Sequence, residues 1–469
     1  MAAAIEQLAL GKSSILVVPD YRDIDDLLKT VDAFGLSDRV ANFSSEQTPS
    51  MRYSAFLKTL SGEPVVVVGS RAAIWAPVRN LGSIMLWDDL DQNLHETAAP
   101  YIHTREVALM RQRLQDCNLL FAGHSRSAEI QRLVQIGYLN ESESSFAPPR
   151  IIATKTQARI DSTTYGLARK AFESGGSVLV QVSATGHTQS LYCNGCQSRA
   201  ICGSCHGPLF TASDGATKCR WCSALALSYN CLDCGSSELR MGSAGSSRTA
   251  SELGKSFPGV QVIESTHDKR VMDVSPGKKL VVATAGCEPR VAGGYALVVL
   301  LDANRALAKD TLRASEYAVR NWANACSMVS VEGQIIAVGF PDSLARDFAV
   351  WKQIQLAQRE LNTRRELGFP PAIRFASVTG PLELLNSMIH GLADAIDAGR
   401  GKFEVLGPFS LGQDQDRYLI RFDYAVGNVL AKELRARSLK ISAGNVGTSA
   451  KTGRTTRLVK IKMDDPEVV

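Results

Sequence analysis

Four Cys-x-x-Cys pairs follow one another closely in the middle of the chain. They use eight of its eleven cysteines: Cys193, Cys196, Cys202, Cys205, Cys219, Cys222, Cys231 and Cys234. A structural zinc ion binds four thiolates in a tetrahedron, and a Cys-x-x-Cys turn presents two of them together. Four such turns supply two complete four-thiolate sites with no paired cysteine left over. The spacing therefore predicts two zinc ions per chain.

The order of the pairs indicates which of them share a metal ion. Residues 206–218, between the second and third pairs, are long enough for a ribbon hairpin that returns the chain to the same ion. We therefore expect nested sites. The inner site would use Cys202, Cys205, Cys219 and Cys222, and the outer site Cys193, Cys196, Cys231 and Cys234.

Other roles for these cysteines fit less well. A disulfide framework needs an oxidising compartment, and the start MAAAIEQLALGKSS lacks the basic and apolar segments of a signal peptide. A redox dithiol needs only one Cys-x-x-Cys beside a βαβ unit, so redox chemistry would leave three of the four pairs without a role. His187 and His206 lie nearby, but eight thiolates already fill both sites. Cys117, Cys287 and Cys326 stand alone in mainly apolar sequence and are expected in the core.

Composition indicates a protein of several domains. A chain of 469 residues with 45% hydrophobic content can bury two or three cores, because single cores rarely grow past about 250–300 residues. No apolar run approaches the roughly 20 residues that span a bilayer, so we expect a soluble, cytoplasmic protein. The net charge of +5 permits a nucleic-acid partner without requiring one.

Basic residues gather near the end of the chain. They are Lys432, Arg435, Arg437, Lys440, Lys451, Arg454, Arg457, Lys460 and Lys462. Residues 457–462 alternate as a strand does, so that Lys460 and Lys462 share one face and Ile461 the other. Lys460 and Lys462, with Arg454 in the preceding turn, are the candidate DNA contacts. The alternative is a solvated helix face followed by a strand edge.

Short apolar strands alternate with helical segments in two successive blocks, which is typical of an α/β fold with parallel sheets covered on both faces. The first block has strands at 14–18, 64–68, 82–86 and 118–121, and the second at 177–182, 260–264, 279–284, 295–301 and 334–338. A single long helix is expected from 343 to 367, ending at Gly368-Phe369-Pro370-Pro371.

The expected domains follow from these blocks. Residues 1–141 form a first lobe, residues 142–190 and 241–342 a second lobe, residues 191–240 the two-zinc insert, and residues 343–469 a helix followed by an α+β domain.

Several motifs, in order over nearly the whole chain, resemble the PriA primosome proteins. VGSRAA at 68–73, WAP at 75–77 and NLG at 80–82 resemble that family's VGTRSA, FAPF and NLG. PYIHTREVA at 100–108 resembles PRYHARDVA. LLDA at 300–303 and RELGFPP at 365–371 resemble further family segments, and the four cysteine pairs match its zinc insert. The resemblance implies two RecA-like helicase lobes with the zinc insert in the second.

The chain departs from the family in the motifs that hydrolyse ATP. The DEEH box, which in the family orders Mg²⁺ and activates water, falls on Trp87-Asp88-Asp89-Leu90, and the SAT segment on Ala122-Gly123-His124-Ser125. The arginine-finger box QxxGRxGR falls on residues 324–331, which contain no arginine. Loss of such an arginine costs on the order of 10³ to 10⁵ in rate. We therefore expect motor motifs too degenerate for catalysis, with no catalytic residues, and ATP binding is doubtful.

A phosphate loop is not expected at Gly11-Lys12-Ser13. The first glycine position of that motif is Glu6, and a helical run precedes the segment where a strand should lie. The segment instead resembles an ordinary helix C-terminus. In the resembled family the true loop lies just upstream of the position of Met1, after a 3′-end-binding domain.

The resemblance implies a DNA-binding primosome component without ATPase or helicase activity. Its implied partners are forked, single-stranded or duplex DNA, primosome proteins, the machinery that loads the replicative helicase, and single-stranded-DNA-binding protein. Two alternatives remain open: an active ATP-dependent 3′–5′ helicase, and a zinc-containing protein-interaction module unrelated to DNA.

Overall fold

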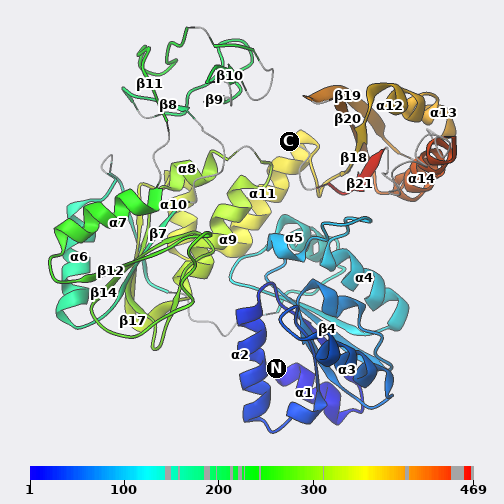
Figure 1. Cartoon of the computed structure of the whole chain (residues 1–469), viewed down its shortest axis with the longest axis horizontal. Coiled ribbons are helices and arrows are strands. Elements are labelled where there is room, and N and C mark those ends of the chain that lie inside the picture. The colour runs from blue at the N-terminus through cyan, green and yellow to red at the C-terminus, as the bar shows by residue number, and fades with distance from the viewer. Residues whose placement is uncertain are drawn as a thin grey trace. The chain divides into compact units, whose positions relative to one another are not determined.

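The chain is mixed α/β with parallel sheets and divides into two compact units (Figure 1). The computed structural model describes residues 1–142, 149–156, 159–183, 191–196, 198–211, 215–219, 224–226, 228–241, 245–309, 311–396, 401–412, 414–444 and 459–465. Unit 1 comprises Met1–Glu143, Thr311–Glu316 and Gln353–Val469, and unit 2 comprises Ser144–Asp310 and Tyr317–Lys352. Within the described part of the chain, no helix has the length and apolar content needed to cross a membrane.

Unit 1 begins with a five-stranded parallel sheet of order β2-β3-β1-β4-β5. Its strands are β1 (Ser13–Val17), β2 (Val40–Phe43), β3 (Val66–Gly69), β4 (Leu81–Trp87) and β5 (Asn118–Ala122). Its helices are α1 (Ala2–Ala9), α2 (Tyr21–Ala33), α3 (Pro49–Leu60), α4 (Thr104–Gln115) and α5 (Ala128–Gln135). Alternate residues of β1 enter two apolar clusters: Ile15 packs with Val107 of α4, and Leu16 packs with Ile24 of α2. Both faces of the sheet are therefore covered, as the apolar runs predict.

Unit 2 contains a six-stranded parallel sheet of order β12-β14-β7-β16-β17-β6. Its strands are β6 (Ile151–Thr154), β7 (Val178–Val182), β12 (Gln261–Ser265), β14 (Lys279–Thr284), β16 (Tyr295–Leu300) and β17 (Val329–Val338). The helices of this part of the sequence are α6 (Ser162–Glu173), α7 (Gly245–Ser256), α8 (Ala303–Leu307), α9 (Ala314–Cys326) and α10 (Asp342–Ala349). Two short strands, β13 (Asp273–Val274) and β15 (Arg290–Val291), pair separately. The central strand β7 is buried along its whole length.

The strands β2 and β6 were not predicted from the sequence. Each is four residues long and lies at the edge of its sheet, and between them only Ala41 is fully buried. Asn42 interrupts β2, and the apolar run of β6 covers only residues 151–153, so neither strand has the longer apolar run that marks a central parallel strand. Gly11 and Lys12 follow the C-terminus of α1, as expected, and lead into β1 at Ser13, with φ of +69° at Gly11.

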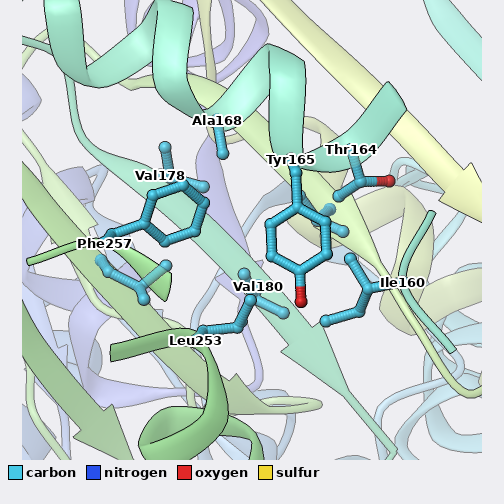
Figure 2. Close-up of a pocket in the computed structure, with 10 residues that line it drawn as sticks. Ile160, Thr164, Tyr165, Ala168, Val178, Val180, Leu253 and Phe257 are labelled. Atoms are coloured by element: carbon cyan, nitrogen blue, oxygen red, sulfur yellow. The ribbon is translucent and has the colours of Figure 1, made fainter. Parts of the chain in front are cut away.

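A small apolar cavity of about 10 Å³ lies beneath α6 in unit 2. Figure 2 shows the side chains of Tyr165 and Phe257 beside it, with Val180 of β7 below, and the two rings lie 5.9 Å apart. None of the ten residues that line it is charged. We interpret it as a packing gap between the helices and the sheet.

The cysteine-rich insert lies between β7 and α7. It contains two antiparallel pairs, β8 (Leu191–Cys193) with β11 (Leu239–Met241), and β9 (Leu209–Thr211) with β10 (Thr217–Cys219). The β9–β10 pair is the hairpin expected between the second and third cysteine pairs. The outer strands β8 and β11 enclose it in sequence, which is the nesting that the spacing predicts.

The last part of the chain forms an antiparallel sheet of order β19-β20-β18-β21. Its elements are α11 (Gln353–Leu367), β18 (Arg374–Gly380), α12 (Leu382–Ile389), α13 (Leu392–Ala395), β19 (Phe403–Gly412), β20 (Gln415–Phe422), α14 (Gly427–Gly444) and β21 (Lys460–Met463). The order of strands and helices after α11 is of the β-α-β-β-α-β type. Helices α12 and α14 pack on one face of the sheet, where Leu385 and Leu430 meet Val378 and Ile420.

The prediction of one helix from 343 to 367 is wrong. The chain instead forms α10 and α11, separated at Trp351, whose φ is +56°. The Trp351 N–H donates to the carbonyl of Phe348, and the two rings lie 6.0 Å apart. Phe348 is fully buried and also contacts Trp322. The helix ends in a left-handed residue, Trp351, and the Lys352 N–H donates to the carbonyl of Asp347 at 2.9 Å, so the chain makes this break without Gly or Pro.

Candidate functional site

Four turns of the same construction carry the paired cysteines. In each turn, the N–H of the first cysteine donates to the carbonyl five residues later. The bonds run from Cys193 to Ser198 (2.9 Å), from Cys202 to Gly207 (2.7 Å), from Cys219 to Ala224 (2.9 Å) and from Cys231 to Ser236 (2.9 Å). The same backbone bond therefore recurs at the first cysteine of each of the four pairs.

The outer cluster contains Cys193, Cys196, Cys231 and Cys234, whose sulfur atoms all lie within 4.8 Å of one another. The Sγ atoms of Cys193 and Cys234 are 3.5 Å apart, as are those of Cys196 and Cys231. These distances are far longer than the roughly 2.05 Å of a disulfide. They approach the spacing of about 3.8 Å that a tetrahedron with Zn–S bonds of about 2.3 Å requires. The four thiols therefore fit a zinc ion.

The inner cluster contains Cys202, Cys205 and Cys219, again within 4.8 Å of one another, with 3.4 Å between the Sγ atoms of Cys205 and Cys219. Cys222 lies outside the described residues. The structure thus brings together seven of the eight predicted ligands, in the two groups that the nesting predicts. His206 is exposed, and His187 lies outside the described residues.

Hydrogen bonds favour the thiolate form of Cys193 and Cys231 in the outer cluster, whereas the Ser236 N–H is outweighed by the neighbouring thiols, which raise the pKa of Cys234. The Tyr229 hydroxyl donates to the sulfur of Cys231 and lowers the pKa of that thiol to about 5. The backbone N–H of Cys196 lowers the pKa of Cys193. Thiolate is the form that binds a metal ion, so both contacts prepare the cluster for one. Tyr229 is not among the residues predicted from the sequence, where its one signal is its place two residues before Cys231.

A tryptophan and a histidine occupy the carboxyl ends of β4 and β5. The ring of Trp87 packs edge-on against the ring of His124, with 5.1 Å between centroids and 88° between planes. Asp88, which follows Trp87, is buried with φ of +54°, and its N–H donates to the carbonyl of Ala122. Leu90 is buried as well. The carboxyl end of β4 therefore carries one ring of an aromatic pair, followed by two buried aspartates, Asp88 and Asp89.

Asp89 is held by two partners inside the protein. Its Oδ2 accepts from Arg105 at 2.9 Å and from the hydroxyl of Ser127 at 2.7 Å. Burial raises the pKa of Asp89, while the Arg105 guanidinium opposes that rise. The Asp89 carboxylate therefore binds Arg105 and Ser127, which both belong to unit 1.

The same buried ion network continues through Glu129 at the start of α5. Glu129 pairs with Arg313 and, at 3.8 Å, with Arg105. Arg313 lies 3.2 Å from Glu316, and Glu316 pairs in turn with Arg364 of α11. Arg364 is only 1% exposed. Three guanidinium groups and three carboxylates thus join α4, α5, residues 311–316 and α11 within unit 1.

We expect Glu129→Gln to destabilise this part of unit 1. Burial alone would raise the pKa of Glu129, but Arg313 and Arg105 hold it well below its usual range. The stabilisation is therefore present above about pH 4.5 and is lost as the pH falls towards the lowered pKa. Removing one partner of a buried pair costs about 3–5 kcal/mol. Hydrogen exchange of the α4 and α5 amides at neutral pH should accelerate in the variant.

Glu63→Gln is the matched control for that variant. Glu63 pairs with Arg39 at 3.3 Å, but its side chain is 72% exposed. An exposed pair of this kind contributes at most about 1 kcal/mol. Equal acceleration of exchange in both variants would show that the buried network does not stabilise unit 1.

One face of the antiparallel sheet in unit 1 carries basic residues. Lys460 of β21 lies opposite Thr379 of β18, which lies opposite Arg417 of β20, so the three side chains form a row across neighbouring strands. Ile461 enters the apolar cluster beneath α12 and α14 on the other face. The predicted alternation of β21 is therefore confirmed.

The nine basic residues near the end of the chain do not form one described surface. Lys460 is exposed, whereas the Lys462 side chain is 19% exposed and lies 3.4 Å from Asp465. Arg454 lies outside the described residues, as do Lys451 and Arg457. Arg437 of α14 donates to the carbonyl of Met388 at 2.9 Å. Helix α14 covers the opposite face of the sheet from Lys460, so Lys460 is the candidate contact best placed for a phosphate.

The family model and the curated proteins that match this chain belong to primosomal or replication restart proteins. Residues 365–466 match the family model of the primosomal protein N C-terminal domain. The chain is 34% identical to the probable replication restart protein PriA of Mycobacterium bovis, over 98% of this chain and 75% of that protein. It is 27% identical to the replication restart protein PriA of Treponema pallidum, over 55% of this chain and 41% of that protein.

Solved helicase structures align only distantly. RecG bound to a three-way DNA junction aligns with a TM-score of 0.40 and 14% identity, over 76% of this chain and 40% of that one. The Escherichia coli DEAH/RHA helicase HrpB aligns with a TM-score of 0.33 and 13% identity, over 72% of this chain and 38% of that one.

Proposed function

The chain belongs to the PriA family of replication restart proteins, and from this membership we propose that it recognises stalled or branched replication forks and promotes reloading of the replicative helicase. The observation that carries the proposal is the 34% identity over 98% of the chain, which includes both parallel sheets and the cysteine-rich insert. Its partners would be forked, single-stranded and duplex DNA, primosome proteins, the loading machinery and single-stranded-DNA-binding protein. Work on chromosomal DNA would place it in the cytoplasm.

In this proposal the two parallel sheets are RecA-like lobes and the insert holds two zinc ions. The zinc ions would be bound by the eight paired cysteines, and a four-thiolate zinc ion supplies folding energy to a small domain that has little core of its own. The outer cluster and the three described thiols of the inner cluster support this assignment. Tyr229 would hold the thiolate of Cys231 by its hydroxyl group.

The lobes would serve as a scaffold without hydrolysing ATP. Trp87 stands where the family has its metal-binding aspartate, and Asp89 is bound by Arg105 and Ser127. Residues 324–331 contain no arginine to contact a γ-phosphate. An active helicase would need carboxylates and arginines free at these positions. Family membership counts against a zinc module unrelated to DNA.

We expect Lys460→Ala/Lys462→Ala to weaken binding to forked and to unrelated duplex DNA alike. Each phosphate contact that is lost should lower the salt slope of log K by roughly 0.7 to 0.9. Because Lys462 is partly neutralised by Asp465, Lys460→Ala alone should give most of the effect. Fluorescence anisotropy of labelled DNA over a series of salt concentrations measures both quantities, and zinc content should not change.

Lys29→Ala/Lys255→Ala is the matched control, since it removes the same charge from two exposed lysines on α2 and α7. It should leave the salt slope unchanged. If Lys460→Ala/Lys462→Ala binds forks with the wild-type slope, this sheet face does not contact DNA.

A further inference from the structure

A short loop in unit 1, residues 96–102, holds a tyrosine in an unusual backbone conformation. Tyr101 has φ of +60°, in the left-handed region that glycine favours and bulky residues rarely adopt. Its N–H donates to the carbonyl of Ala98 at 2.7 Å, and the N–H of Glu96 donates to the carbonyl of Ile102 at 3.1 Å. Paired backbone at His95 and His103 closes the base of the loop. The loop therefore holds Tyr101 in place at a cost in backbone strain.

The ring of Tyr101 lies against the two lysines of β21. The Nζ atom of Lys460 is 4.9 Å from the ring centroid, and that of Lys462 is 5.9 Å from it. Both distances are within the range of a cation–π interaction. Lys460 and Lys462 project from the sheet face opposite α12 and α14, so one ring contacts both candidate phosphate ligands.

An aromatic ring and a carboxylate have different effects on the charge of a neighbouring lysine. Asp465 offsets the charge of Lys462, whereas an aromatic face restrains an ammonium group and leaves its charge and N–H donors available to a phosphate. A free lysine side chain loses considerable rotamer entropy when a ligand orders it. A ring that orders two lysines beforehand removes part of that cost from the binding step.

We propose that Tyr101 is a positioning residue for DNA binding, and that it holds Lys460 and Lys462 ready for neighbouring phosphates of one DNA strand. The proposal rests on the proposed function, because it assumes that the basic face of β21 contacts DNA. The proposal adds Tyr101, which is far from β21 in the sequence, to the residues that support DNA binding at β21. It also gives a reason for a tyrosine in a left-handed backbone conformation. Tyr101 acts through the lysines, so its effect depends on their presence.

The test is a double-mutant cycle in the full chain, with labelled forked DNA as the probe. Tyr101→Gly removes the ring but suits the backbone at this position, so the loop should keep its shape. It should weaken binding about threefold to tenfold, the range expected when the cation–π contacts to Lys460 and Lys462 are lost. Tyr101→Phe, which keeps the ring, should bind almost as the wild type does.

The decisive comparison is Tyr101→Gly in the Lys460→Ala/Lys462→Ala background, where it should cause no further loss. An equal loss in both backgrounds would overturn the proposal, since it would show that the ring stacks on a base or supports the fold independently of the lysines. Tighter binding by Tyr101→Gly would overturn it too, because the ring would then shield the lysines from DNA.

Failure of this inference can be told apart from failure of the proposed function. If Lys460→Ala/Lys462→Ala weakens binding and Tyr101→Gly does not, the basic face binds DNA without help from Tyr101, and only the positioning role is wrong. If the lysine variant has no effect, both the DNA contact at β21 and the role of Tyr101 are wrong. Thermal unfolding and zinc content of each variant provide the folding control.

Discussion

Protein purified without chelator should contain two zinc ions per chain, and Cys219→Ala should contain one. Each site needs four thiolates, and loss of one leaves a three-thiolate site that binds zinc far more weakly. Structural zinc contributes about 10–16 kcal/mol to the folding of small domains at neutral pH, so the β9–β10 hairpin should unfold with its metal. Elemental analysis by mass spectrometry, with hydrogen exchange over residues 198–219, measures both effects.

Two further variants sharpen this prediction. Cys231→Ala should also reduce the content to one zinc ion, but from the outer cluster, so the β8–β11 pair should unfold and the inner site should remain. Cys117 is buried in the apolar cluster of the first sheet, and Cys117→Ala should keep both ions at a small packing cost. A wild-type content of one zinc ion or none would contradict the assignment.

The purified chain should hydrolyse no ATP above background when forked DNA is added. Loss of an arginine finger alone lowers turnover by about 10³ to 10⁵, and residues 324–331 contain no arginine. In the proposed assignment of the motifs, Trp87 would additionally replace the aspartate that orders Mg²⁺ in the family. Phosphate release, measured beside an active helicase of the same family as positive control, gives the rate.

Trp87→Asp by itself should not restore turnover. It would return a carboxylate to the end of β4, but residues 324–331 would still lack arginine, and Asp89 would still be bound by Arg105 and Ser127. Robust DNA-stimulated turnover by the wild-type chain would instead support the alternative of an active helicase. It would also show that the motor motifs are not at the positions we assign to them.

Features built from neighbouring residues could be predicted from the sequence. Four Cys-x-x-Cys spacings predict two clusters because each pair of ligands lies on one tight turn, and the structure groups the described thiols as expected. The alternation of β21 predicts that Lys460 and Lys462 share a face because successive strand residues point to opposite sides. Apolar runs predict the central strands, which are buried on both faces.

Features that depend on distant partners were decided by the tertiary structure. Arg364 belongs to a helix whose Gln, Arg and Glu residues resemble a solvated surface, yet it is buried because Glu316 lies beside it. Tyr101 contacts Lys460 although the two are far apart in the chain. Periodicity and spacing report which residues share a turn or a face. They do not report which charges and rings folding brings together, because those contacts depend on how whole elements pack.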